Sequence, residues 1–246
     1  MYPTLFTIGS LPISSFGVLF ILGYLIAVFF VFTQGRKDLI LIRHNLNEEL
    51  ILDLVISTSF FGFLGARLLH IVFHSSEFGF DPLKLVLFTY FPGLSVLGAV
   101  LGALAFLFYV TRQRKVPLFP LLDIAGFGFL LGAPLAFIGG FLGQNVSTIP
   151  VFIIEAILLF ALFWVLLYMK QKGIIRRDGV VGLTILIIFA IVSFGFEFFR
   201  FDRLYIGFLS VNQLLSVLIG FGAAGALTHL KIQTVKTFLR KFNLLW

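Results

Sequence analysis

Five long stretches of this chain carry no charged residue, and they constrain its fold more than any other feature. They cover residues 1–35, 85–111, 124–154, 179–196 and 204–230. Roughly 20 consecutive apolar residues in a helix cross the hydrocarbon core of a bilayer. A transmembrane β-barrel would instead show short segments of alternating hydrophobicity. The stretches therefore predict an all-α, polytopic integral membrane protein.

The composition excludes several other classes of protein. Only 12 % of the residues are charged and 60 % are hydrophobic, whereas a water-soluble domain carries about 25 % charged residues. A soluble enzyme, a nucleic-acid-binding module and a disordered chain are therefore excluded. The chain has no cysteine, so it has no disulfide, no thiolate nucleophile and no cysteine-ligated metal. We expect no metal site, no soluble cofactor and no nucleic-acid partner.

We expect seven transmembrane helices in a single transmembrane domain, residues 1–246. The uncharged stretch 124–154 is too long for one upright helix, and Gly139, Gly140, Gly143 and Pro150 predict a break within it. No basic residue precedes the first apolar run, so we expect a first span and not a cleavable signal. The predicted spans are about 12–33, 50–74, 93–111, 119–143, 150–169, 180–200 and 205–229.

The basic residues alternate from one connecting segment to the next, which predicts an orientation. Fourteen of the 18 Lys and Arg residues lie at 36–43, 112–115, 170–177 and 231–241, and three (Lys84, Arg200 and Arg203) lie on the opposite side. Cytoplasmic loops of membrane proteins carry the excess of positive charge. We therefore expect the N-terminus outside and the C-terminus in the cytoplasm.

Several ionisable residues lie inside or at the ends of the predicted spans. A charge in hydrocarbon costs at least about 2.5–3.5 kcal/mol, so each such residue is a candidate for a functional site. Arg67 is about 17 residues into the second span, or roughly 25 Å above its cytoplasmic start. Glu155 lies one turn into the fifth span, and Glu197 and Arg200 close the sixth. We expect these residues to meet at one depth, near the outer surface.

Two interpretations of this cluster remain open. In the first, Arg67 pairs with Glu155 or Glu197 and only locks the helices together. In the second, the cluster lines a polar chamber that is open to lipids, where Arg67 and Arg200 bind a phosphate through their planar guanidinium groups. His70 and His74 follow Arg67 on one helical face and are candidate bases or interfacial residues. Asp53 and Asp123 lie towards the cytoplasm and are expected to be separate.

Ordered motifs over residues 8–222 resemble those of the prolipoprotein diacylglyceryl transferase family. The second-span motif is GARLLHIVFH at 65–74, and IPVFIIEAILL at 149–159 resembles the entry to the family's fifth span. The two most specific motifs are GFEFFRFD at 195–202 and GFLSVNQLLSVL at 207–218. The resemblance assigns a polar site to residues that match the family: Arg67, Glu155, Glu197, Arg200, Asp202 and Gln213, with His70 as a supporting residue.

The resemblance implies a transferase of the bacterial cytoplasmic (inner) membrane. Its members move diacylglycerol from phosphatidylglycerol, an anionic phospholipid, to the cysteine thiol of a prolipoprotein at the outer face of that membrane. The partners implied are therefore phosphatidylglycerol, the signal peptide of a prolipoprotein and the membrane itself. No catalytic residue is assigned from the sequence.

Five positions depart from the family's pattern in ways that matter for chemistry. Leu97 replaces a histidine, Phe137 and Ser193 replace arginines, Gly140 replaces an asparagine, and Phe16 replaces a tyrosine. Three functions therefore stay open. They are a divergent diacylglyceryl transferase, an inactive relative that binds phospholipid or lipoprotein precursor, and a transporter of lipids or amphiphiles.

Overall fold

Seven helices of the described chain run alongside one another, and each is long and apolar enough to cross a membrane. The computed structural model describes residues 4–8, 11–44, 46–73, 93–143, 151–200 and 204–241. The seven helices are α1 (Ser15–Gly35), α3 (Glu48–Phe73), α6 (Val96–Arg114), α7 (Leu118–Gly143), α8 (Val151–Gln171), α9 (Val180–Glu197) and α10 (Val211–Lys241). The prediction of a polytopic, all-α membrane protein is confirmed.

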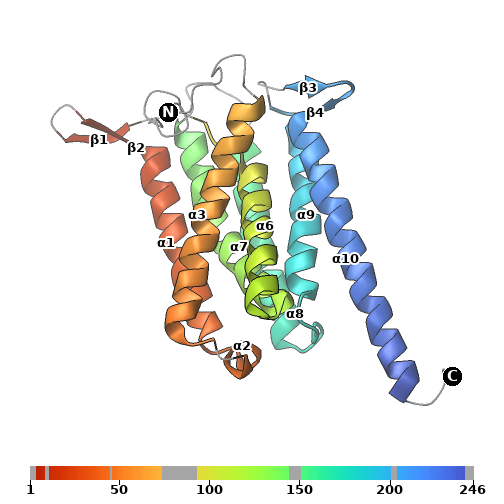
Figure 1. Cartoon of the computed structure of the whole chain (residues 1–246). Helices are drawn as coiled ribbons and strands as arrows, with labels where there is room; N and C mark the ends of the chain where they lie inside the picture. Colours follow the sequence, from red (N-terminus) through yellow and green to blue (C-terminus); the bar gives the residue numbers. More distant parts are fainter. Residues whose placement is uncertain are drawn as a thin grey trace.

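Short elements mark the two ends of the bundle in Figure 1. Two antiparallel hairpins, β1 (Thr4–Ile8) with β2 (Leu11–Ser14) and β3 (Tyr205–Ile206) with β4 (Leu209–Ser210), lie at one end, which we call the hairpin end. The short helix α2 (Leu39–Arg43) lies at the other, the α2 end. The orientation of these ends in the membrane stays a prediction, with the hairpin end outside.

The seventh helix differs most from its expected boundaries. The seventh helix begins at Val211 and not at 205, because residues 205–210 form the β3–β4 hairpin around Gly207, whose φ is +67°. It also continues to Lys241, beyond the expected end at 229. Gly139 and Gly140 lie inside α7, so they do not mark the break, and Pro150 lies outside the described residues.

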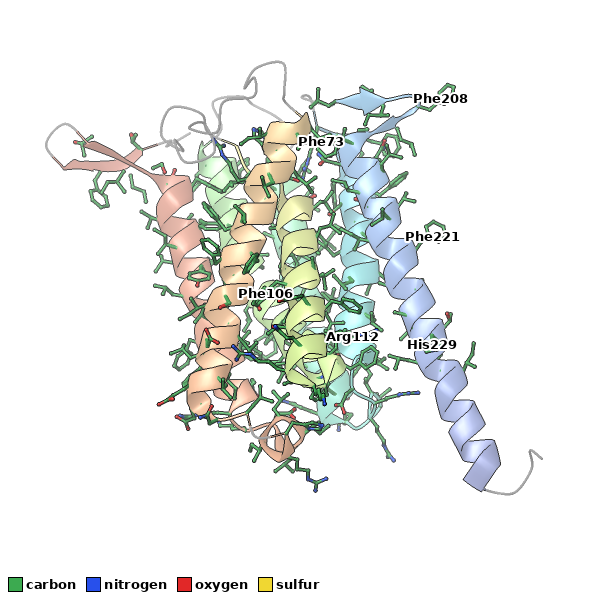
Figure 2. All side chains as sticks on the ribbon, viewed as in Figure 1. Phe73, Phe106, Arg112, Phe208, Phe221 and His229 are labelled. Carbon is green, nitrogen blue, oxygen red and sulfur yellow. The ribbon has the colours of Figure 1, made fainter. Side chains whose placement is uncertain are left out.

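Large apolar side chains cover much of the outer surface of the bundle. Phe221 on α10 is 77 % exposed, and Phe29 on α1 is 70 % exposed. Figure 2 shows Phe221 pointing away from the other helices, and Phe208 at the far tip of the β3–β4 hairpin. An exposed surface of this composition is stable in contact with lipid chains, because hydrocarbon carries no penalty for contact with apolar groups.

Helices α1 and α7 contact each other closely through glycines. A Cβ atom on Gly23 would lie 2.4 Å from the carbonyl oxygen of Gly132, and Gly128 is similarly close to Val31 and Ala27. Helix α3 meets α6 in the same way, since a Cβ on Gly65 would lie 2.6 Å from the carbonyl oxygen of Gly98. Small residues allow transmembrane helices to approach and to gain packing contacts that lipid does not provide.

Helix α7 also fixes the start of α9. Asp123 is 2 % exposed, and its two carboxylate oxygens accept hydrogen bonds from the backbone N–H groups of Gly179 at 3.0 Å and Gly182 at 2.7 Å. These donors lie at the N-terminus of α9, where a helix has no internal acceptors for them. Asp53 pairs with the half-exposed Arg114 at 3.2 Å. Both aspartates therefore have structural partners near the α2 end.

The contact of α1 with α7 can be tested at Gly23. The change Gly23→Ala places a methyl group against a backbone oxygen that has no room to move, so we expect a loss of about 1–3 kcal/mol of stability. Thermal unfolding in detergent measures this loss as a lower midpoint. Gly222→Ala on α10 is the matched control, because nothing lies within 4 Å of its Cβ position. An equal midpoint for both variants would contradict the close contact.

The role of Asp123 as a cap for α9 can be tested in the same assay. Asp123→Ala leaves two buried N–H groups without acceptors, and each such group costs about 1–3 kcal/mol. Asp53→Ala removes an exposed ion pair, which contributes at most about 1 kcal/mol, and a long, exposed hydrogen bond from Ser57. We expect a clear decrease in the unfolding midpoint for the Asp123 variant and little change for the Asp53 variant. Similar midpoints for the two variants would show that the cap contributes little.

Candidate functional site

A partly open cavity of about 960 Å³ runs between the helices. Its lining comes mainly from α1, α3, α6, α7 and α9, together with Phe152 of α8 and the first turn of α10. At the hairpin end it is lined by polar side chains, namely Glu197, Arg200, Asn212 and His70. The remaining wall consists largely of apolar and small residues. The cavity therefore has one polar end and a long apolar body.

Arg200 joins two buried carboxylates at this polar end. Its Nη2 donates to both carboxylate oxygens of Glu155 at 3.3 Å, and its Nη1 lies 3.7 Å from Oε2 of Glu197. Both glutamates are 1 % exposed, whereas the side chain of Arg200 is 28 % exposed. The guanidinium carbon of Arg200 also lies 5.4 Å from the ring centre of Phe152. Two carboxylates therefore hold the arginine, and part of its side chain stays exposed.

The carboxylate of Glu197 is held by the start of α10. Asn212 Nδ2 donates to both of its oxygens, at 3.1 and 3.2 Å, and Ser210 Oγ donates to Oε1 at 3.0 Å. Sequence reasoning did not single out Asn212 or Ser210, although both lie in the GFLSVNQLLSVL motif. A neutral polar side chain costs less to bury than a charge. The criterion of burial cost, which identified the charged residues, therefore did not identify these two.

Gln213 has a structural role one residue further along. Its Oε1 accepts a hydrogen bond from the backbone N–H of Ser210 at 2.9 Å, and Ser210 Oγ accepts from the N–H of Gln213 at 3.2 Å. This reciprocal pair closes the turn from β4 into α10. It thereby positions Ser210 and Asn212 against Glu197, so the predicted polar network includes Gln213 indirectly.

Arg67 contacts a backbone carbonyl, whereas the sequence left two partners open for it, a buried glutamate or a lipid phosphate. It is 1 % exposed, and its Nη1 donates to the carbonyl oxygen of Gly93 at 3.0 Å. The ion pairs of Glu155 and Glu197 are made by Arg200 instead. The reason is geometric, because depth along a helix was known from the sequence but the direction in which each side chain points was not.

His70 lies one turn beyond Arg67 and contacts the same segment. A Cβ on Gly93, whose φ is +145°, would lie 1.9 Å from Nε2 of His70. Only glycine fits at this position, so the ring of His70 is packed against the backbone while it also lines the cavity. Asp202 and His74, the other two predicted polar residues, lie outside the described residues.

The five departures from the family pattern all face the cavity. Phe16 on α1, Leu97 on α6, Phe137 and Gly140 on α7, and Ser193 on α9 are among its lining residues. Leu97 and Phe137 are also almost completely buried, at 4 % and 6 % exposure. Within the described part of the chain, no group of three His, Asp or Glu side chains is placed to hold a metal ion.

Comparison with known proteins identifies the family. The family model described as prolipoprotein diacylglyceryl transferase matches residues 3–229. A relative from Geobacter sulfurreducens is 31 % identical, over 87 % of this chain and 89 % of that protein. Relatives from Lactobacillus johnsonii and Lactobacillus gasseri are 26 % and 27 % identical, each over 90 % of this chain and 87 % of theirs. All three are named phosphatidylglycerol–prolipoprotein diacylglyceryl transferase. The chain belongs to the prolipoprotein diacylglyceryl transferase family.

Proposed function

We propose that this protein transfers the diacylglyceryl group of phosphatidylglycerol to the cysteine thiol of a prolipoprotein. The family match over residues 3–229 supports the reaction. One structural observation carries the assignment to a site. It is the partly exposed side chain of Arg200 at the polar end of a cavity whose body is apolar. A phospholipid has the same division between a charged head group and apolar chains.

The reaction requires one bond to form and one to break. The cysteine sulfur, after loss of its proton, attacks the glyceryl carbon that is bonded to the phosphate oxygen. A sulfur–carbon bond forms, the carbon–oxygen bond breaks, and glycerol phosphate leaves with the bonding electron pair. Because negative charge remains on the leaving phosphate, a fixed guanidinium beside it lowers the barrier.

We assign the direct phosphate contact to Arg200. A guanidinium presents several N–H donors in one plane, so it can bind two phosphate oxygens together. Glu155 and Glu197 orient this group and lower the cost of its burial. Arg67, the second arginine for which we expected phosphate binding, is buried against Gly93. We assign it a positioning role for the segment that precedes α6.

The proposal includes a location in the cell. The chain is a multi-pass membrane protein by its seven apolar helices. The alternation of basic residues supports an outward-facing hairpin end in the bacterial cytoplasmic membrane. In that orientation the polar end of the cavity would meet the signal peptide of a prolipoprotein at the outer face.

One observation favours a second candidate function, in which the protein binds phosphatidylglycerol or the precursor but does not transfer the diacylglyceryl group. Leu97 and Phe137 line the cavity where the resemblance places a histidine and an arginine. Leucine has no proton to exchange, and phenylalanine cannot bind phosphate. Loss of one charge-stabilising donor costs about 10²–10³ in rate. A protein with this cavity but without the histidine and the arginine would still bind phosphatidylglycerol or the precursor.

A transfer assay separates the two candidates. Purified protein in proteoliposomes receives phosphatidylglycerol labelled in its diacylglyceryl part and a peptide with the prolipoprotein cysteine. We expect a labelled thioether product, none with a Cys-to-Ser peptide, and a rate about 10²–10³ lower for Arg200→Ala. Lipid binding without product would favour the second candidate. Absence of both binding and product would contradict both candidates.

A stability measurement separates the chemical role of Arg200 from its structural role. Arg200→Ala leaves the buried carboxylate of Glu155 without its partner, which costs about 3–5 kcal/mol. The double variant Arg200→Ala with Glu155→Gln removes that charge, so we expect its unfolding midpoint to recover. Its transfer rate should stay low. Recovery of the rate together with the midpoint would show that Arg200 acts only by stabilising the fold.

A further inference from the structure

We propose that the cavity binds the acyl chains of its lipid through both halves of the helix bundle, and that residues near the α2 end limit the length of these chains. The inference rests on the proposed function for the identity of the lipid. It adds a chain-length selection that involves residues far from the polar site.

The first argument is the extent of the cavity along the helices. On α3 its lining runs from His70 at the hairpin end to Ile51 at the α2 end, and on α7 from Gly140 to Leu121. Each pair is 19 residues apart, which corresponds to about 29 Å at 1.5 Å per residue. The hydrocarbon core of a bilayer is about 30 Å thick. The cavity thus extends well past the half of the bilayer that one lipid leaflet occupies.

The second argument is the change in chemistry along this length. The hairpin end is lined by Glu197, Arg200 and Asn212, whereas the α2 end is lined by apolar residues, among them Leu107, Leu121 and Leu122. Water needs two to four polar partners to occupy a buried site, and apolar cavities stay dry. An empty apolar space also loses the packing contacts of its lining. Within a membrane, hydrocarbon chains are the available material that fills this space.

The third argument is size. A methylene group has about the volume of a water molecule, roughly 30 Å³ in the liquid. A cavity of about 960 Å³ therefore has room for at least on the order of thirty methylenes, or about two long acyl chains. This matches the two acyl chains of a phospholipid.

Ala125 provides a place to test the inference. It lines the cavity seven residues from the start of α7, in the half near the α2 end, and it is half-buried. Ala125→Phe adds a ring to the apolar body and leaves the polar end unchanged. Ala161→Phe is the matched control, because Ala161 is exposed on the outer face of α8. Leu107→Ala has the opposite effect, since it enlarges the same half.

The measurement is the ratio of short-chain to long-chain phosphatidylglycerol bound. The protein is placed in nanodiscs with an equal mixture of lipids that carry chains of twelve, sixteen or twenty carbons, and native mass spectrometry identifies the retained lipid. For Ala125→Phe we expect a shift of about tenfold towards the short chains, the discrimination that one or two methylenes give in a tight apolar pocket. Leu107→Ala should shift the ratio towards the long chains, and Ala161→Phe should match the wild type.

Several results would overturn the inference. They are an unchanged ratio in both cavity variants, equal shifts in Ala125→Phe and Ala161→Phe, or displacement of the lipid by a signal peptide irrespective of chain length. The readout is binding, so it is independent of transfer. Chain selection without transfer would contradict the proposed function alone, and transfer without chain selection would contradict the inference alone.

Discussion

The interaction on which the polar end of this protein depends is the pairing of Arg200 with two buried carboxylates. A charge inside hydrocarbon is stable only with a partner, and here one guanidinium satisfies Glu155 from α8 and Glu197 from α9. Asn212 and Ser210 extend the same network to α10. Helices α8, α9 and α10 are therefore joined at one end through hydrogen bonds and ion pairs. Removal of Arg200 takes the ion-pair partner from both carboxylates, so the network depends on this one side chain.

The apolar body of the cavity results from how the other helices are joined. Helices α1 and α7 approach through Gly23 and Gly132, and α3 and α6 through Gly65 and Gly98. Each pair is tight internally, because glycine contacts bring the two backbones together. The cavity lies between these pairs and α9, and Leu97, Ala125 and Phe189 are among its lining residues. Close packing within pairs and open space between them are compatible in a membrane, since lipid chains can fill what the protein leaves empty.

The sequence predicted the helices well because the apolar runs are long. A run of 18 or more apolar residues has few alternatives to a membrane-spanning helix. It also predicted that Glu155, Glu197 and Arg200 meet, since helix length fixes depth. It did not predict the partner of Arg67, because the rotation of α3 about its axis is set by its packing on α6. The β3–β4 hairpin was missed because Tyr205, Ile206 and Phe208 are as apolar as the helix that follows. Gly207 was the available signal for a turn there, at a φ that favours glycine.

The buried charges of the network stabilise the fold, whereas only groups that line the cavity can contact a bound lipid. The network has a structural reason of its own, because an unpaired buried charge destabilises the protein whether or not it turns over substrate. Chemistry on a bound lipid requires groups that face the lipid. Among the described residues that line the polar end, these are Arg200, Glu197, Asn212 and His70. Glu197 accepts hydrogen bonds from Asn212 at both oxygens, which fixes its position beside Arg200. Under the proposed function, Arg200 supplies the positive charge for the leaving phosphate, and Glu197 holds Arg200 in place. Leu97 and Phe137 in the cavity wall add no charged group to this set.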